Sequence, residues 1–278
     1  MPRPSRWSRG WAVSAAEVAG RLLGCDVTAT RRLAGGDLSA VFRLTLAGGT
    51  TLIAKQASDA PAEAAMLRAI RVAGAPAPEV KAVAGEWLLM EDIAAGGTVA
   101  AAWPDLARVL RRLHAATGED YGWPTDHGFG SVRIENQPAA DWPAFWAERR
   151  LRCHLPFVRP DLARRIARLA EQLPDLLPHR PRPSLLHGDL WGGNVLVAGN
   201  RVAALIDPAC YHGDREVDVA MLTLFDRPPA VFFDALALDA GWERRQPIYR
   251  LWPLIVHLRL FGDSYADAVE TALSSVHC

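Results

Sequence analysis

The stretch LLHGDLWGGNVLV, residues 185–197, has a polar centre between two apolar ends. Residues 185–186 and 195–197 have the composition of short buried strands, whereas the centre is too polar for a strand and too rich in glycine for a helix. We therefore predict a loop over residues 187–194 that is held between two anchored ends. A rigid frame of this kind can hold polar side chains in a constant arrangement, as functional sites require.

The chain before this loop begins with a β-rich half. Ser14 and Glu17 have the spacing of a capping box, which predicts a short first helix, and a second helix should begin at Pro61. Segments rich in β-forming residues and separated by glycine pairs predict antiparallel hairpins. The expected strands cover residues 26–33, 38–46, 50–56, 79–83 and 87–90.

The pattern changes to a helical one near residue 98. Gly96-Gly97 should end the strands, Thr98 can cap the next helix, and apolar residues then recur at helical spacing, for example at 162, 166, 169 and 173. We predict an α+β protein with two lobes. A β-rich N-terminal lobe would cover residues 1–92, and a mainly helical C-terminal lobe would cover residues 93–278.

Composition and charge exclude several classes of partner. The 31 basic and 31 acidic residues balance, so no excess of charge points to nucleic acid or to an anionic membrane. The apolar stretch 251–261 is interrupted by His257 and Arg259 and is too short to span a bilayer. The basic start leads into no apolar signal core, and the four cysteines form no CxxC pair, so we expect reduced thiols and a location in the cytoplasm.

The polar loop has the residue types of a phosphotransfer site. The pattern His187-x-Asp189-x4-Asn194 is similar to the catalytic loop of kinase-like phosphotransferases, in which the Asp contacts the acceptor hydroxyl and the Asn binds a metal. A following strand, VAALID, ends in Asp207, which suits a carboxylate that holds Mg²⁺ against nucleotide phosphates. An HGD tripeptide alone is more often a structural turn, and only the full combination favours phosphotransfer.

Lys55 is the matching cation in the β-rich half. The chain has only two lysines, and a cation in an apolar strand is costly unless it has an anionic partner, for which Glu63 is the candidate. The alternative is an edge-strand lysine that reaches water. Gly35 and Gly36 could lay backbone N–H groups over the phosphates, although a plain hairpin explains them nearly as well.

A longer set of motifs resembles the fructosamine (ketosamine) kinase family, a branch of the aminoglycoside-phosphotransferase-like, protein-kinase-like fold. The resemblance covers roughly residues 30–265, with these blocks in the family order: LAGGDLSAVFRL, AEAAML, YGWPTDHGFGSV, DWPAFWAERRL, LLHGDLWGGNV, ALIDPACYHGDREVDVAMLTLF and HLRLFGDSY. Two features depart from the family: Asp37 stands where some members have Cys, and the interval from Lys55 to Glu63 is shorter than usual.

The resemblance implies ATP-dependent phosphorylation of a sugar hydroxyl on a free or protein-bound ketosamine, a deglycation reaction. It implies that Asp189 is the catalytic carboxylate, that Asn194 and Asp207 bind Mg²⁺, and that Lys55, paired with Glu63, binds the phosphates of ATP. Backbone groups around Glu91 and Ile93 are the expected partners of adenine.

The acceptor side leaves alternatives open. Trp191 could offer a flat face to the sugar, or it could simply pack the loop. Asp214 and Glu216 could receive the protonated amine of the ketosamine, or they could cap the following helix. His257, which interrupts an apolar helical run, fits a hydrogen-bonded core histidine better than a substrate contact.

Three other functions compete with the ketosamine kinase. An aminoglycoside or choline kinase of the same fold would favour a strongly acidic helical half, but residues 92–278 contain 23 acids and 20 arginines, a net charge of only −3. A metal-dependent hydrolase could use His187, Asp189, Asp207 and His212, but it leaves Lys55 unexplained. A nucleotide-binding pseudoenzyme would keep the fold without turnover.

Overall fold

The computed structural model describes residues 14–33 and 39–276, so the predicted phosphate-binding Gly35 and Gly36 lie outside the described residues. The backbone divides into two compact units. One consists of Met1–Pro61 and Val80–Asp92, and the other consists of Ala62–Glu79 and Ile93–Cys278. In the described part of the chain, no helix is both long and apolar enough to cross a membrane.

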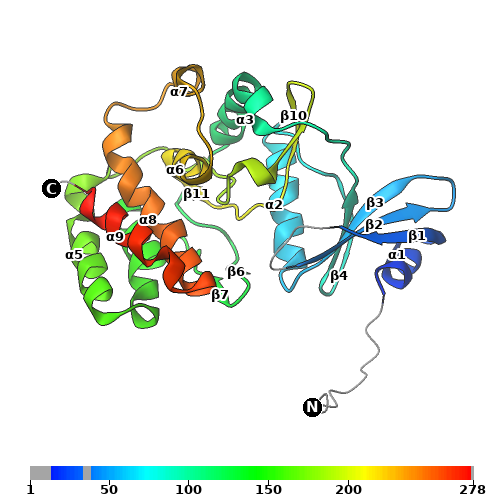
Figure 1. The fold of residues 1–278 in the computed structure, drawn as a ribbon, viewed down its shortest axis with the longest axis horizontal. Coiled ribbons are helices and arrows are strands. Elements are labelled where there is room, and N and C mark those ends of the chain that lie inside the picture. Colours follow the sequence, from blue (N-terminus) through cyan, green and yellow to red (C-terminus); the bar gives the residue numbers. More distant parts are fainter. Residues whose placement is uncertain (1–13, 34–38, 277–278) are drawn as a thin grey trace, which may run out of the picture. The chain divides into compact units, whose positions relative to one another are not determined.

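The first unit is an antiparallel sheet with one helix. Helix α1 (Ala15–Leu23) begins with the predicted capping box, in which Ser14 and Glu17 bond each other's backbone N–H groups, and it ends at Gly24. The sheet has the strand order β1-β2-β3-β5-β4, and its neighbouring strands are all antiparallel. Its strands are β1 (Val27–Arg32), β2 (Ala40–Leu46), β3 (Thr51–Gln56), β4 (Val80–Ala84) and β5 (Trp87–Glu91). Figure 1 shows this sheet with α1 beside it.

A small core joins this helix to the sheet. Ala15 and Ala19 of α1 pack with Leu44, Ala54 and Leu89 of β2, β3 and β5, and all five are nearly inaccessible to solvent. The apolar alternation along these strands therefore faces α1, as burial of one sheet face requires.

The second unit is mainly helical. Helix α2 (Ala60–Val72) starts at the end of the first unit and continues in the second. The second unit also contains short strands of two to five residues near the polar loop. Those strands are β8 (Ser184–Leu185), β9 (Val195–Ala198), β10 (Arg201–Leu205) and β11 (His212–Gly213), and a separate hairpin pairs β6 (His127–Phe129) with β7 (Val132–Ile134). Strand β8 pairs with β11, and β9 pairs with β10.

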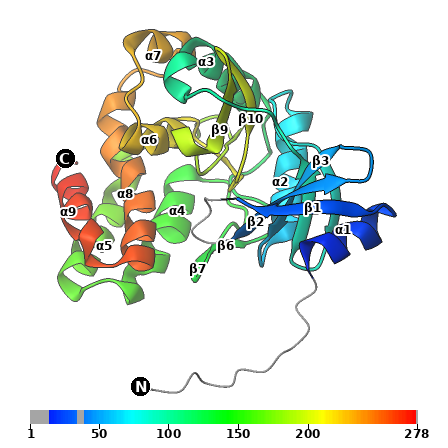
Figure 2. The ribbon, with the colours of Figure 1, turned by 45° about the vertical axis from the view of Figure 1, so that its right-hand side comes forward.

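The helices of the second unit enclose an aromatic core. Trp142 and Trp146 pack against Tyr249 and Trp252, with ring centroids 5.0–6.2 Å apart, and α8 lies beside α9 (Figures 1 and 2). The remaining helices are η1 (Val99–Ala101), α3 (Trp103–Ala115), α4 (Trp142–Trp146), the π-helical turn η2 (Ala147–Leu151), η3 (Arg152–Phe157), α5 (Pro160–Leu176), η4 (Gly192–Asn194), α6 (Glu216–Phe225), α7 (Ala230–Leu236), α8 (Trp242–Phe261), η5 (Asp263–Tyr265) and α9 (Ala266–Ser274).

This arrangement confirms the predicted α+β class. The antiparallel sheet lies in the first unit and the helices dominate the second. The backbone changes from one unit to the other after Asp92, whereas residues 62–79 pack with the helical unit. Thr98 precedes the short helix η1, but its side chain makes no capping hydrogen bond.

Candidate active site

The polar loop is held at its start by a close backbone contact. Residues 187–194 connect β8 to β9, and the carbonyl of His187 accepts a hydrogen bond of 2.8 Å from the backbone N–H of Ala209. Gly188 has a φ of 81°, and a Cβ atom there would collide with the carbonyl of Ala209. Only glycine fits this position, because both the left-handed backbone and the contact exclude a side chain.

A buried carboxylate fixes the same turn from the helical side. Asp218 of α6 accepts hydrogen bonds of 2.9 Å from the backbone N–H groups of His187 and Gly188, and its Oδ2 lies 2.9 Å from Nε2 of His114 on α3. Burial raises the pKa of Asp218, but the hydrogen bond and charge of His114 and the bonds to the loop outweigh it and hold the pKa below its usual range. The loop is therefore anchored to two helices.

His187 itself faces the interior. Its side chain is fully buried, and Nε2 lies 3.0 Å from the carbonyl oxygen of Ile206. Burial lowers the pKa of His187, so the neutral ring positions the chain after β10 rather than facing solvent. Nδ1 of the same ring accepts from the backbone N–H of Asp189 at 3.4 Å. Both ring nitrogens are therefore engaged by the backbone, which leaves neither for a metal and weakens the hydrolase alternative.

Asp189 and Asn194 lie together in the loop, where Asn194 is buried and Asp189 is partly exposed. Nδ2 of Asn194 donates to the carbonyl oxygen of Asp189 at 2.8 Å and to its carboxylate Oδ2 at 3.0 Å. The five-residue spacing brings these groups together because the loop closes on itself through η4, where the backbone N–H of Asn194 donates to the carbonyl of Trp191.

Asp207 is connected to the same loop through its neighbour in the chain. The backbone N–H of Ile206 donates to the carbonyl of Asn194 at 3.0 Å, and the carbonyl of Ile206 faces His187. Asp207 follows with a φ of 52°, in the left-handed region where Asp is tolerated better than most residues. The structure thus places three predicted residues, Asp189, Asn194 and Asp207, on one hydrogen-bonded frame.

Trp191 begins a row of aromatic rings beside this frame. Its ring is 41% exposed and meets Phe225 edge to face at 5.9 Å. Phe225 lies 5.5 Å from the ring of His257, which in turn lies 5.0 Å from Tyr265. Nδ1 of His257 is 2.7 Å from the carbonyl oxygen of Pro253, and burial lowers the pKa of the ring. Trp191 and His257 therefore belong to one partly exposed aromatic wall.

The two acids expected at the acceptor amine are buried. Oδ2 of Asp214 accepts 2.7 Å from the hydroxyl of Tyr249, and its Oδ1 accepts 3.1 Å from the backbone N–H of Glu216. Both carboxylate oxygens of Glu216 pair with Arg245, at 2.6 and 2.8 Å. Burial raises the pKa of Asp214 and of Glu216. These contacts favour the alternative in which the two acids hold the start of α6 over contact with a substrate amine.

The residues expected at the nucleotide are spread over both units. Lys55 lies on β3 between Val41 and Leu88 of the neighbouring strands, and it is only 7% exposed. Glu63 lies in the first turn of α2, within the second unit. Glu91 ends β5, and Ile93 begins the longer of the two segments that make up the second unit. The burial of Lys55 favours a paired cation over a lysine that reaches water.

Sequence patterns did not reveal the side chains that hold the backbone of the polar loop. Asp218 and His114 fix the start of the loop, and Oδ2 of Asp226 accepts 2.7 Å from the backbone N–H of Gly192 near its end. The sequence did contain one signal for these anchors, which is Asp218 within the apolar helical run VDVAMLTLF. A carboxylate on a buried helix face requires hydrogen-bond donors nearby. The partners of Asp218 in the loop, however, lie 30 and 31 residues away along the chain, and His114 lies 104 residues away on α3.

Known proteins resemble this chain along nearly its whole length. A family model described as fructosamine kinase matches residues 13–277. A Lactiplantibacillus plantarum protein named as a probable ketoamine kinase is 30% identical over 267 residues, which cover 89% of this chain and 94% of that protein.

Solved structures show the same relationship. A candidate fructosamine-3-kinase from Thermobifida fusca superposes with a TM-score of 0.87 and 30% identity, over 95% of this chain and 99% of that one. A thermostable mutant of an aminoglycoside phosphotransferase has a TM-score of 0.64 and 20% identity over 94% of this chain and 96% of its own, and so shares the fold alone. The predicted kinase-like phosphotransferase fold is confirmed, and this chain belongs to the fructosamine kinase family.

Proposed function

We propose that this protein transfers the γ-phosphoryl group of ATP to a sugar hydroxyl of a ketosamine, either free or attached to a protein. The observation that supports this most directly is the hydrogen bond from Asn194 to the carboxylate of Asp189, in a loop whose backbone Asp218 fixes. Phosphoryl transfer depends mainly on positioning and charge neutralisation, and an anchored carboxylate and amide meet the first requirement.

Asp189 would orient and deprotonate the acceptor hydroxyl. The hydroxyl oxygen bonds to the γ-phosphorus as the bond to the bridging oxygen of ADP breaks, and the proton passes to the Asp189 carboxylate. The hydrogen bond from Nδ2 of Asn194 fixes the direction in which this carboxylate points. Because Asp189 is only partly buried, its carboxylate stays within reach of an acceptor.

Asn194 and Asp207 would hold Mg²⁺. An amide oxygen and a carboxylate oxygen are the ligands that this hard cation prefers, and the contacts of Ile206 keep the two residues on one frame. The ion would neutralise the phosphate charge that develops during transfer. Lys55 would supply the cation for the α- and β-phosphates, with Glu63 as its proposed partner. Backbone groups around Glu91 and Ile93 would receive adenine.

The aromatic wall would receive the sugar. Trp191 is exposed and adjoins the catalytic loop, so one face of the acceptor ring can lie against it. His257 reaches the same wall through Phe225, which places a polar ring atom among apolar groups. This arrangement suits an acceptor that is largely neutral, whereas a polycationic antibiotic would need more acidic groups than the net charge of −3 over residues 92–278 provides.

The test is an acceptor panel with the full chain, ATP and Mg²⁺. Fructosyl-lysine and ribulosyl-lysine, each free and within a peptide, would be compared with kanamycin and choline, and NMR would locate the phosphate on the product. We expect kcat/KM for the ketosamines to exceed the others by roughly tenfold or more.

Asp189→Asn is the matched control for background ATP hydrolysis. Preference for kanamycin or choline would overturn the acceptor assignment while leaving phosphotransfer in place. Tight binding of Mg·ATP without transfer to any member of the panel would instead support the pseudoenzyme alternative.

A further inference from the structure

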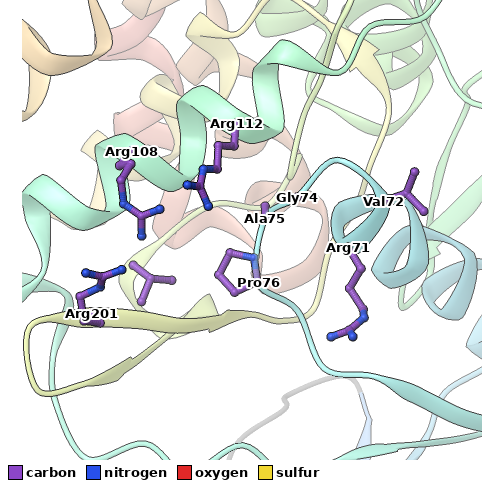
Figure 3. Close-up of a pocket in the computed structure, with 9 residues that line it drawn as sticks. Arg71, Val72, Gly74, Ala75, Pro76, Arg108, Arg112 and Arg201 are labelled. Carbon is purple, nitrogen blue, oxygen red and sulfur yellow. The ribbon is translucent and has the colours of Figure 1, made fainter.

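A basic cavity lies in the second unit, apart from the residues of the candidate active site. It is a depression that is widely open to solvent, with a volume of about 660 Å³. Figure 3 shows the residues around it. It is formed by the end of α2, the turn after it, one face of α3 and the start of β10. The lining residues are Arg71, Val72, Gly74, Ala75, Pro76, Arg108, Arg112, Arg201 and Val202.

Three guanidinium groups dominate this cavity. Arg108 and Arg112 project from one face of α3 toward Arg201 and the turn over residues 74–76 (Figure 3). Like charges four residues apart on a helix repel each other, and Arg201 adds a third positive charge beside them. Among the described residues no carboxylate forms an ion pair with Arg112, so this cluster is incompletely neutralised.

One buried carboxylate holds two of these arginines in place. Asp105 is 8% exposed, and its Oδ1 lies 2.7 Å from Nη2 of Arg108 and 3.1 Å from Nε of Arg201. Its Oδ2 accepts 2.9 Å from the backbone N–H of Val202, which ties the carboxylate to β10. A guanidinium carries five N–H donors, so Arg108 and Arg201 retain donors for a ligand after they bind Asp105.

The fourth arginine has a different role at the edge. Nη1 of Arg71 donates 2.8 Å to the carbonyl oxygen of Ala77, which fixes the turn after α2. The backbone N–H of Leu205 donates to the carbonyl of Pro76 in the same turn. These two bonds connect the turn after α2 to α2 itself and to β10. The wall of the cavity is therefore held in place by the protein's own hydrogen bonds.

We propose that this cavity binds a small anion that carries two or more phosphate groups. Guanidinium groups match phosphate oxygens with paired N–H donors. Asp105 holds Arg108 and Arg201, and the charge of Arg112 beside them leaves a net positive site. A nucleic acid would need an extended basic surface, whereas the chain as a whole has equal numbers of acidic and basic residues. The ligand would relieve the repulsion between Arg108, Arg112 and Arg201.

The experiment measures binding of inorganic pyrophosphate to the full chain by calorimetry, without Mg²⁺ and at two salt concentrations. The double variant Arg112→Gln/Arg201→Gln removes two cavity charges. Arg111→Gln/Arg164→Gln removes two charges from exposed arginines of the same unit and is the matched control. We expect binding to weaken at least roughly tenfold in the cavity variant and to stay unchanged in the control.

Citrate and a hexaglutamate peptide provide two further arms, and thermal unfolding without ligand verifies that each variant is folded. Equal pyrophosphate affinity in all three proteins would place the anion elsewhere and overturn the proposal, as would a wild-type protein that binds no pyrophosphate. Binding of citrate or of the peptide in place of pyrophosphate would overturn the assigned ligand class. None of these readouts requires catalytic turnover, so they are independent of the proposed kinase activity.

Discussion

Asp189 and Asp207 are held by different partners, and we propose different roles for the two carboxylates in the reaction. Asp189 receives the side-chain amide of Asn194, whereas Asp207 follows Ile206, whose two backbone groups are bonded to the loop. The first carboxylate would serve the acceptor and the second would serve the metal. Replacing each aspartate with asparagine should therefore impair different steps, transfer for Asp189 and nucleotide binding for Asp207.

We expect Asp189→Asn to retain Mg·ATP affinity and to lose roughly 10²–10⁴-fold in transfer rate, the usual effect of removing a general base. Asp207→Asn should instead weaken nucleotide binding in a Mg²⁺-dependent way, because it removes a negative oxygen ligand. Calorimetry of Mg·ATP and single-turnover transfer assays would separate the two effects. The same loss of nucleotide affinity in both variants would contradict this division of roles.

The residue pattern predicted the loop but not its anchors. His187, Asp189 and Asn194 are close in sequence, so a spacing rule brings them together without knowledge of the fold. Asp218 and Asp226 reach the same loop from α6 and the residue after it, and only tertiary packing determines that approach. For Asp214 and Glu216 the sequence offered two readings, a contact with the substrate amine or a role at the start of α6. Their burial and their bonds to Tyr249 and Arg245 favour the second.

The contact between η3 and α8 places a buried histidine beside an arginine, an arrangement that disfavours protonation of the histidine. His154 of η3 is 1% exposed, and its Nδ1 lies 2.8 Å from Nη1 of Arg259 on α8. Burial, together with the charges of Arg259 and Arg150, lowers the pKa of His154 to about 3. The folded protein thus keeps this ring neutral, whereas the unfolded chain protonates it near its ordinary value of about 6.5.

Between about pH 6.5 and pH 3 the unfolded chain therefore binds the extra proton, so folding stability should fall as the pH is lowered. The contribution of this histidine approaches about 1.4 kcal/mol per pH unit at its steepest. His154→Gln keeps an acceptor for Arg259 but cannot be protonated, and it should flatten this part of the profile. Urea unfolding from pH 4 to pH 7 measures the slope, with His179→Gln at an exposed histidine as the control; equal slopes in wild type and His154→Gln would contradict the expectation.

Elements with a clear period were predictable, and those set by tertiary contacts were not. Alternation and glycine pairs placed the strands of the first unit within one or two residues of β2, β3, β4 and β5. The segment VAALID was expected to be a strand through Asp207, but β10 ends at Leu205 because Ile206 turns to bond Asn194 and His187. The hairpin of β6 and β7 gave no such signal, since each strand has only three residues.

At the scale of the whole molecule, the sequence indicated two differently built parts and a change after residue 92. It did not indicate that residues 62–79 pack with the later part of the chain. The helix signal in this segment is local, whereas its assignment depends on bonds such as that from the backbone N–H of Cys210 to Sδ of Met66, at 3.3 Å. Contacts across such sequence separations leave no periodic pattern.

The packing of residues 62–79 with the later part of the chain has a consequence for the nascent chain on the ribosome. The strands of the first unit are complete once residue 91 has been synthesised, but Met66 and Pro76 bond to Cys210 and Leu205, which are synthesised much later. At about 5–20 residues per second, the intervening residues take roughly 6–25 s to emerge. We expect stalled chains that expose only the first 130 residues to be cleaved by protease within 62–79, and chains that expose all 278 to be protected there. Protection of this segment in the shorter chains would show that it is buried before residues 205–210 are available, and would contradict this expectation.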